Sequence, residues 1–523
     1  MAGRFSLGEV NVDVSVGRDR APCHADPDTP FRIAILGDFS GRVNRSICEV
    51  GAGLANRRVV ALDRDNFDEV LAKLGAGIDL PIDDRPLSLR FVELDDFHPD
   101  RIFERVEIFQ KLRQMRQRLA DPETFAEMLR EMRLGPAHAA EAAKPLTPPG
   151  PPRPVHADIG RLTSGSVLEQ ALAATEGQPE GSRPSRAPDE LRTFVERVVE
   201  PHLVAAADPR QAEMIAAVDR ATGAQMRALL HVPDFQALES AWRALFWLVR
   251  NVQTNERLKL YLLDVSKAEL AADLATADDL RLTGVYKLLV EQTVGTPGAE
   301  PWAVLAGNYT FGPSREDARL LGRLAKVACA AGAPFLAAAS PRALGCESVS
   351  ELPHPRDWKS LADSDDTHAW AALRQLPEAF YLGLALPRFL LRLPYGKNTD
   401  RTELFDLEEM PPIPVHADYL WGNPVFACAF LLAQAFSEYG WEMRPGTHSE
   451  IDGLPLHTYR EDGESRLMPV AEVLLTEDAV EQILDHGLMP LVSLQGRDAV
   501  RLARFQSIAD PPTSLAGLSR GRD

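Results

Sequence analysis

The chain has 523 residues, of which 45% are hydrophobic and 25% charged, a composition typical of a globular protein with roughly two to four domains. Its formal net charge is −19, and an acidic surface repels phosphate backbones. We therefore expect no nucleic-acid partner.

The five cysteines are scattered and form no CxxC pair, so neither a disulfide framework nor a zinc cluster is expected. They lie at Cys23, Cys48, Cys329, Cys346 and Cys428. The first residues lack the apolar core of a secretory signal, and no apolar run is long enough to span a bilayer. These features predict a cytoplasmic protein that does not insert into membranes and needs no cofactor.

The first predicted element is a strand over residues 10–16, where apolar and polar residues alternate. Its apolar face consists of Val10, Val12, Val14 and Val16. A long loop isolates it from the next strand, residues 31–36. The strand can therefore pair within its own sheet or be donated to a neighbouring subunit. The second strand runs into a glycine-containing turn, but the Lys-Ser/Thr of a phosphate loop is absent.

A strand over residues 87–94 is followed by an amphipathic helix that extends to residue 119. Between them lie Asp95, Asp96, His98 and Asp100, which are candidate metal ligands by residue type. Acidic residues directly before a helix more often cap its first turn and complement its dipole. We therefore expect capping here, and no metal site.

A proline-rich run at residues 145–154 marks a domain boundary, because such a segment cannot pack as helix or sheet. It predicts a first domain at 1–140, a linker at 141–188 and a second domain at 189–523. Within the linker, residues 166–175 form a predicted short helix.

The second domain begins with helices, of which residues 231–251 are predicted to be a core helix, because apolar residues recur there at spacings of three and four along one seam: Phe235, Leu238, Trp242, Leu245 and Val249. Beyond it strands alternate with helices, which is typical of α/β proteins. The predicted strands are 258–265, 302–307, 333–340, 380–386, 454–459, 468–476 and 488–494. Directly after the first of them, Ser266 and Glu269 have the spacing of a capping box at the start of a helix. The expected fold is α/β, with layered mixed sheets flanked by helices, in two modules joined by the proline-rich linker.

No catalytic constellation is recognisable: HExxH, GxSxG and a complete phosphate loop are all missing from the sequence. The feature that most suggests a binding site is a pair of arginines, Arg388 and Arg392, four residues apart in an apolar run. They could form an anion site, but structural ion pairs are the favoured interpretation. The carboxylates considered for these pairs are Asp406, Glu408 and Glu409. The chain is therefore not expected to be an enzyme.

Several blocks in order resemble the large sheath subunit of type VI secretion systems (TssC, the VipB/EvpB family), over about residues 162–512. They include HVPDFQALESAWR (231–243), LLDVSKAEL (262–270), YLGLALPRFLLRLPYG (381–396) and RFQSIADPP (504–512). Residues 10–134 resemble the small sheath subunit (TssB), through FRIAILGDFSGR (31–42) and ELDDFHPDRIFERVEIFQKLRQMRQRL (93–119).

The resemblance implies a structural subunit of a contractile sheath, with small and large subunits fused, that assembles around an inner tube and contracts to drive it out. It implies self-association or a separate sheath chain, an Hcp-like inner-tube protein and baseplate components as partners. It also marks Val10, Val12, Val14 and Val16 as the donated strand. A ClpV-like disassembly ATPase would dock on the helix that carries Val167, Leu168 and Leu172.

Two departures qualify this expectation. The family's large subunit continues well beyond the region matched by Pro512, so the chain is expected to lack the usual C-terminal region. The helix expected to dock the ATPase is internal rather than N-terminal. The alternative is therefore a non-polymerising cap, baseplate-associated protein, or assembly or regulatory factor.

Overall fold

The computed structural model describes residues 28–82, 85–121, 124–125, 209–296, 298–359 and 362–517. The chain divides into two compact units, residues 1–106 with 229–523, and residues 107–228. Each unit is considered by itself. The expected strand at 10–16 and the expected helix at 166–175 lie outside the described residues.

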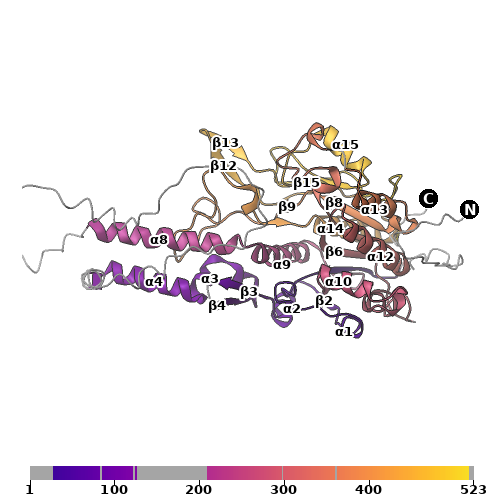
Figure 1. Ribbon diagram of the computed structural model, residues 1–523, viewed down its shortest axis with the longest axis horizontal. Helices are drawn as coiled ribbons and strands as arrows, with labels where there is room; N and C mark the ends of the chain where they lie inside the picture. The colour runs from indigo at the N-terminus through magenta and orange to yellow at the C-terminus, as the bar shows by residue number, and fades with distance from the viewer. Residues whose placement is uncertain are drawn as a thin grey trace, which may run out of the picture. The chain divides into compact units, whose positions relative to one another are not determined.

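Within the described residues, the larger unit is built on a mixed sheet of nine strands, in the order β11-β15-β14-β8-β7-β6-β1-β5-β2. Figure 1 labels β2, β6, β8 and β15 among them. Six inner strands are parallel, and β2, β15 and β11 add antiparallel edges. The strands are β1 (Phe31–Gly37), β2 (Val60–Leu62), β5 (Leu258–Asp264), β6 (Val304–Phe311), β7 (Phe335–Ala339), β8 (Leu382–Leu386), β11 (Glu450–Ile451), β14 (Met489–Ser493) and β15 (Val500–Leu502). The expected α/β class, with a large mixed sheet flanked by helices, is confirmed.

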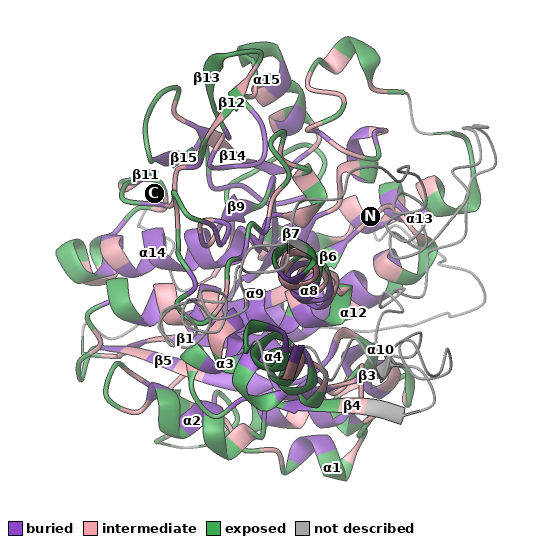
Figure 2. Ribbon diagram, turned by 90° about the vertical axis from the view of Figure 1, so that its left-hand side faces the viewer, coloured by how far each residue is buried: buried purple, intermediate pink, exposed green. Residues whose placement is uncertain are grey.

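Helices cover both faces of this sheet. Alternate side chains of β1 point to opposite faces of the sheet. Phe31 stacks on Phe436 of α14 (Val425–Tyr439), whereas Ala34 and Leu36 belong to the core that includes α12 (Arg315–Ala331). Every residue of β7 and β8 is buried, as expected for parallel strands covered on two sides (Figure 2). No helix of the described residues is long and apolar enough to cross a bilayer.

The predicted core helix is α9 (Pro233–Asn251), which begins with a proline in its first turn. All five residues of its predicted apolar seam are buried: Phe235, Leu238, Trp242, Leu245 and Val249. Other helices of this unit are α1 (Ala52–Ala55), α2 (Phe67–Leu74), α3 (Pro99–Arg105), α10 (Lys267–Ala275), α13 (Asp365–Arg374) and α15 (Glu477–Asp485).

The part of this unit that the structure describes also contains three two-stranded sheets: β3 (Gly77–Ile82) with β4 (Arg85–Arg90), β9 (Phe389–Leu390) with β10 (Trp421–Gly422), and β12 (Thr458–Glu461) with β13 (Glu464–Leu467). The predicted strand at 468–476 is wrong, because those residues form no ladder. Pro469 lacks an amide donor, and Glu472 takes a positive φ of 54° that brings its carboxylate to Arg388.

In the smaller unit, α4 (Glu107–Ala120) packs on α8 (Pro209–Leu230). Arg116 pairs with Asp219 at 2.7 Å, and the Gln211 side chain donates to the carbonyl of Leu119 at 2.7 Å. The amide of Gln211 thereby satisfies a carbonyl that the end of α4 leaves without a helical partner.

Candidate functional site: the junction between the N-terminal segment and the sheet

Strand β1 lies between β5 and β6, although these two strands follow each other in the later part of the chain. Its seven residues are in register with Leu258–Asp264, and Ile33–Leu36 are also in register with Val304–Gly307. A strand from the N-terminal segment thus supplies the backbone partners of two distant strands. We call this place the slot, and the polar contacts around its carboxyl end the junction.

Asp264, the last residue of β5, anchors the turn that follows β1. Its carboxylate accepts from the amides of Phe39 and Ser40 at 2.8 and 3.1 Å and from the Ser40 hydroxyl at 2.7 Å. Burial raises the pKa of Asp264, and the hydrogen bonds from Ser40 and Phe39 oppose that rise. On the other side of the turn, the Trp242 indole donates to the Phe39 carbonyl at 2.7 Å. The turn is therefore held by two elements distant in sequence.

Glu269 is the most highly connected carboxylate of the junction. It completes a capping box with Ser266 at the start of α10. It also receives hydrogen bonds from Arg42 and Arg57 at 2.9 Å, although it is fully buried. Burial raises its pKa, but the bonds from Arg57 and Arg42 outweigh burial and lower the pKa to about 2. Glu269 is therefore ionised at neutral pH and holds two arginines of the N-terminal segment.

A third buried carboxylate, Asp273, lies one turn further along α10. It accepts from the Gly51 amide at 2.6 Å and from the amides of Gly284 and Val285 at 3.0 and 2.8 Å. A Cβ on Gly284 would lie 2.5 Å from the Gly51 carbonyl oxygen, so the two backbones meet too closely for any side chain. Asp264, Glu269 and Asp273 together fix the segment that follows β1.

Arg392 is buried in an ion-pair network beside α9. It contacts Glu239 at 2.9 Å and Glu409 at 2.7 Å, and its guanidinium lies 4.2 Å from the centre of the Tyr395 ring. Burial raises the pKa of Glu409, but the charge of Arg392 outweighs burial and lowers it to about 2. Burial raises the pKa of Tyr395 to about 12. Glu409 is one of the carboxylates considered from the sequence, whereas Glu239, on the core helix, was not.

Arg388 pairs with Glu472 at 2.6 Å, and about half of its side chain is exposed. Both arginines therefore contact carboxylates, but they do not converge on a shared space, because each has its own partners. The ion-pair interpretation remains a prediction for their role in the assembled protein.

The candidate metal ligands act within the fold. Asp96 pairs with Arg105 at 2.6 Å and takes part in a capping box with Glu93, and the His98 ring accepts from the Asp100 amide. Asp100 in turn accepts from two backbone amides of a distant loop at 2.9 and 3.1 Å. Among the described residues, no group of three or more His, Cys, Asp or Glu is placed to hold a metal ion.

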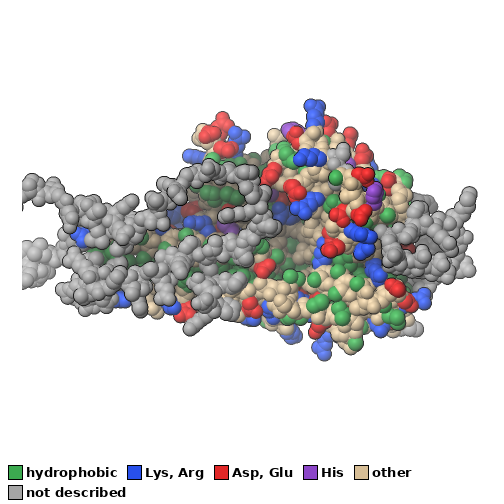
Figure 3. All heavy atoms as spheres, viewed as in Figure 1, with side chains coloured by type: hydrophobic (Ala, Val, Ile, Leu, Met, Phe, Trp, Pro, Cys, Tyr) green, Lys and Arg blue, Asp and Glu red, His purple; other side chains and the backbone are tan. Residues whose placement is uncertain are grey.

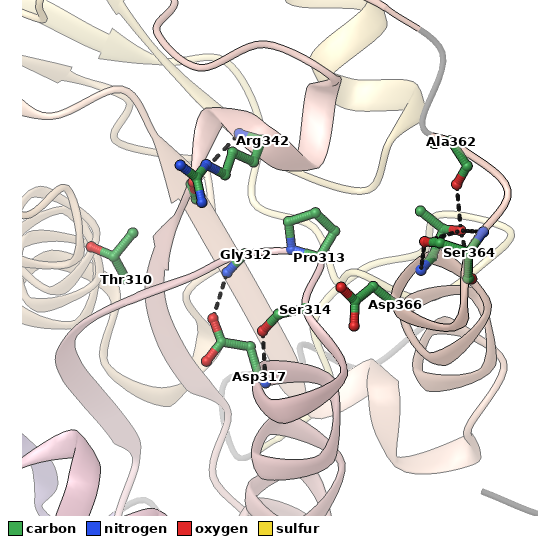
Figure 4. Close-up of a pocket in the computed structure, with 11 residues that line it drawn as sticks. Thr310, Gly312, Pro313, Ser314, Asp317, Arg342, Ala362, Ser364 and Asp366 are labelled. Carbon is green, nitrogen blue, oxygen red and sulfur yellow. Dashed lines mark hydrogen bonds between the residues drawn. The ribbon is translucent and has the colours of Figure 1, made fainter. Parts of the chain in front are cut away.

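A hollow of about 460 Å³ lies where β6 and β7 end (Figure 4). Its polar groups are engaged in local structure: Ser314 and Ser364 cap α12 and α13, and Asp366 accepts from the Arg315 amide at 2.9 Å. Asp317 accepts from the Gly312 amide and pairs with Lys267 at 2.6 Å. Ser314, Ser364 and Asp366 therefore act at the starts of helices.

Sequence reasoning missed most of the junction. The capping pair Ser266 and Glu269 was recognisable from its spacing. Nothing in the sequence indicated that Arg42 and Arg57 would reach Glu269, since they lie more than 200 residues away along the chain. The signal that was present is an aspartate at the end of a mostly apolar strand, LKLYLLD, because a buried carboxylate requires hydrogen-bond donors.

At the slot and the junction, backbone pairing and buried polar side chains join segments that are distant in sequence into one sheet. The chain therefore belongs to the class of proteins whose central sheet is assembled from separate segments. A family model described as "EvpB/VC_A0108, tail sheath N-terminal domain" (VipB) matches residues 212–509, more than half of the chain. A second, described as "Type VI secretion system, VipA, VC_A0107 or Hcp2", matches residues 11–133.

One relative is the type VI secretion system sheath protein TssC1 of Pseudomonas aeruginosa. It is 35% identical over 365 residues, which cover 67% of this chain and 73% of that protein. The chain therefore belongs to the type VI secretion sheath family, and it carries segments of both the small and the large sheath type.

Proposed function

We propose that this protein is a structural subunit of a type VI secretion-like contractile sheath, in which the small and large sheath-type segments act as one fused unit. The observation that carries the proposal is the position of β1, in the slot between β5 and β6. The small-type segment is thereby an inner strand of the sheet that the large-type segment builds. Fusion fixes the ratio of the two segments at one to one and makes their pairing intramolecular.

The distribution of charge on one face does not favour a nucleic-acid partner. On the face in Figure 3, Lys and Arg side chains are interspersed with Asp and Glu side chains instead of forming one basic patch. The edge strands β2 and β11 have three and two residues. Short edges limit indiscriminate pairing, so any added strand must be specified by its own sequence.

For the partners, we propose that the chain associates with further sheath subunits, surrounds an Hcp-like inner tube and meets baseplate components in the cytoplasm. The segment with Val10, Val12, Val14 and Val16 would donate a strand to a neighbour, since its alternation suits main-chain pairing at a sheet edge. The segment with Val167, Leu168 and Leu172 would dock a ClpV-like ATPase. Arg388 and Arg392 would keep their structural pairing in the assembly.

Negative-stain electron microscopy of the purified full chain tests this function. We expect tubes or rings when the chain is mixed with the inner-tube protein. Monomers at high concentration, both alone and with inner-tube protein, would contradict the proposal and favour the non-polymerising alternative. A matched pair of variants tests the strand: Val12→Asp with Val14→Asp should prevent assembly, whereas Asp13→Asn with Ser15→Ala, on the other face, should not.

A further inference from the structure

The slot poses a register problem that its apolar contacts do not solve. Strand β1, FRIAILG, is buried on both faces, so a shift by two residues would still place apolar side chains against apolar side chains. Such a shift is a displacement of about 6.6 Å along a parallel strand. A shift by one residue would instead turn every side chain of β1 to the opposite face of the sheet.

The hydrogen bonds that Asp264 accepts come mostly from the backbone of the turn after β1. Two of the three hydrogen bonds that it accepts come from main-chain amides, which any sequence offers. They hold the end of the inserted strand, but they give little information about which strand it is.

The opposite end of β1 carries a side chain that is held by an enclosed set of partners. The Arg32 guanidinium carbon lies 4.0 Å from the centre of the Trp302 ring and 4.5 Å from that of the Tyr261 ring. Its Nη1 donates to the Glu300 carbonyl, and its Nε lies 3.6 Å from the Glu300 carboxylate. The side chain is 12% exposed. We call Tyr261, Trp302 and Glu300 the cage.

The cage takes residues from both sides of the slot. Tyr261 lies on β5 and Trp302 lies two residues before β6, so the two rings flank the inserted strand. The Cα partner of Arg32 across the ladder is Lys259, which also pairs with Glu300, at 3.0 Å. A strand shifted by two residues would offer the cage Ala34 or Pro30 instead, and would carry the guanidinium away from Glu300. The cage therefore recognises one side chain at one register.

We propose that the cage is the site that identifies the inserted strand, and that Arg32 is the residue that sets its register. This inference rests on the proposed function, since it concerns which small-type strand the large-type segment accepts. A strand without a guanidinium at this position keeps the backbone contacts and loses the cage. The cage thus favours the chain's own segment over a strand from another small sheath-type protein that differs there.

Disulfide trapping in the unassembled full chain tests the register. Ile35→Cys is combined with Ala306→Cys, its Cα partner in β6, or with Val304→Cys or Asn308→Cys, which face it only after a shift by two residues. Disulfide-linked peptides are quantified by mass spectrometry, with Ile35→Cys alone as the control for the natural cysteines. We expect the 35–306 link to dominate.

Replacing Arg32→Met keeps the length of the side chain and removes its charge. We expect the ratio of shifted to native links to rise about tenfold, the effect of losing a desolvated cation–π contact. Arg32→Lys should rescue most of this change. Trp302→Leu, which leaves Arg32 in place, should shift the ratio in the same direction, so the test does not depend on one variant folding.

The matched control is Ser40→Ala, which removes one hydrogen bond at the other end of β1. An unchanged ratio in Arg32→Met, or an equal rise in Ser40→Ala, would overturn the assignment. Because no sheath is formed in this experiment, a failure of the chain to polymerise would contradict the proposed function and leave the register result intact.

Discussion

The charge of Glu269 should stabilise the fold in a pH-dependent way. Its pKa is about 2 in the folded chain, against an ordinary 4.5, which corresponds to about 3 kcal/mol favouring the ionised folded form at neutral pH. Glu269→Gln removes the charge, leaving Arg57 paired with the half-exposed Glu49 and Arg42 with Glu49 and, at 3.7 Å, with Asp264. We expect urea unfolding at pH 7 to show a loss of about 2–3 kcal/mol.

The pH dependence has a defined sign. A lowered folded-state pKa means that the contribution is complete above the unfolded value of 4.5 and is lost as the pH falls from there toward 2. At pH 3 about 1.4 kcal/mol of it should remain. The difference between the wild type and Glu269→Gln should therefore shrink by about half between pH 7 and pH 3.

Comparison with the variant removes the effect of other titrating carboxylates, because both proteins share them. The control is Glu69→Gln, whose exposed pair with Lys73 should contribute less than about 0.5 kcal/mol. The reasoning is refuted if Glu269→Gln costs no more than Glu69→Gln at pH 7, or if its cost is the same at pH 3.

Three further predictions concern other parts of the larger unit. Arg392→Met removes the cation that the buried Glu239 and Glu409 share, of which Glu239 keeps its pair with Arg243 at 2.6 Å, and should cost about 3–5 kcal/mol in urea unfolding. Arg388→Met, at a half-exposed pair, should cost less than about 1 kcal/mol, and equal costs would contradict the network. Gly284→Ala forces a Cβ to within 2.5 Å of a carbonyl oxygen and should cost about 1–3 kcal/mol, seen as a lower Tm; an unchanged Tm would show that the contact relaxes freely. Burial raises the pKa of Cys428 to about 12, so this thiol should react with iodoacetamide only after unfolding. The exposed Cys48 should react in the folded chain, and equal rates at the two cysteines would contradict the burial of Cys428.

The sequence predicted well those features that depend on neighbouring residues. The seam of α9 is visible because its spacing follows one face of a helix, and the capping box at Ser266 because its two residues are three apart. Strands β5, β6, β7 and β8 were all predicted, with ends displaced by a few residues. Their apolar runs lie between turn signals, which is a local pattern.

The position of β1 could not be predicted in the same way. Its sequence identifies a buried strand, but it does not say which strands it pairs with, since main-chain pairing is nearly indifferent to side chains. The expected division into modules at residues 140 and 189 remains a prediction. The sheet contains strands from both sides of that division, since β1 lies between β5 and β6. Which segment occupies that place depends on its register and on the contacts at its two ends, and neither can be read from local sequence.

The arrangement of charges at the slot has a consequence for a sheath subunit. Buried ion pairs contribute little net stability compared with apolar residues, because desolvation offsets their attraction. A wrong arrangement would bury a charge without its partner, which has a much larger cost in free energy. Arg32, at one end of β1, therefore penalises a displaced strand far more than it stabilises the correct one, whereas Arg42 and Arg57 hold the segment beyond the other end. In a subunit that must move as a body, a junction that resists sliding keeps the two segments in one geometry while other contacts change.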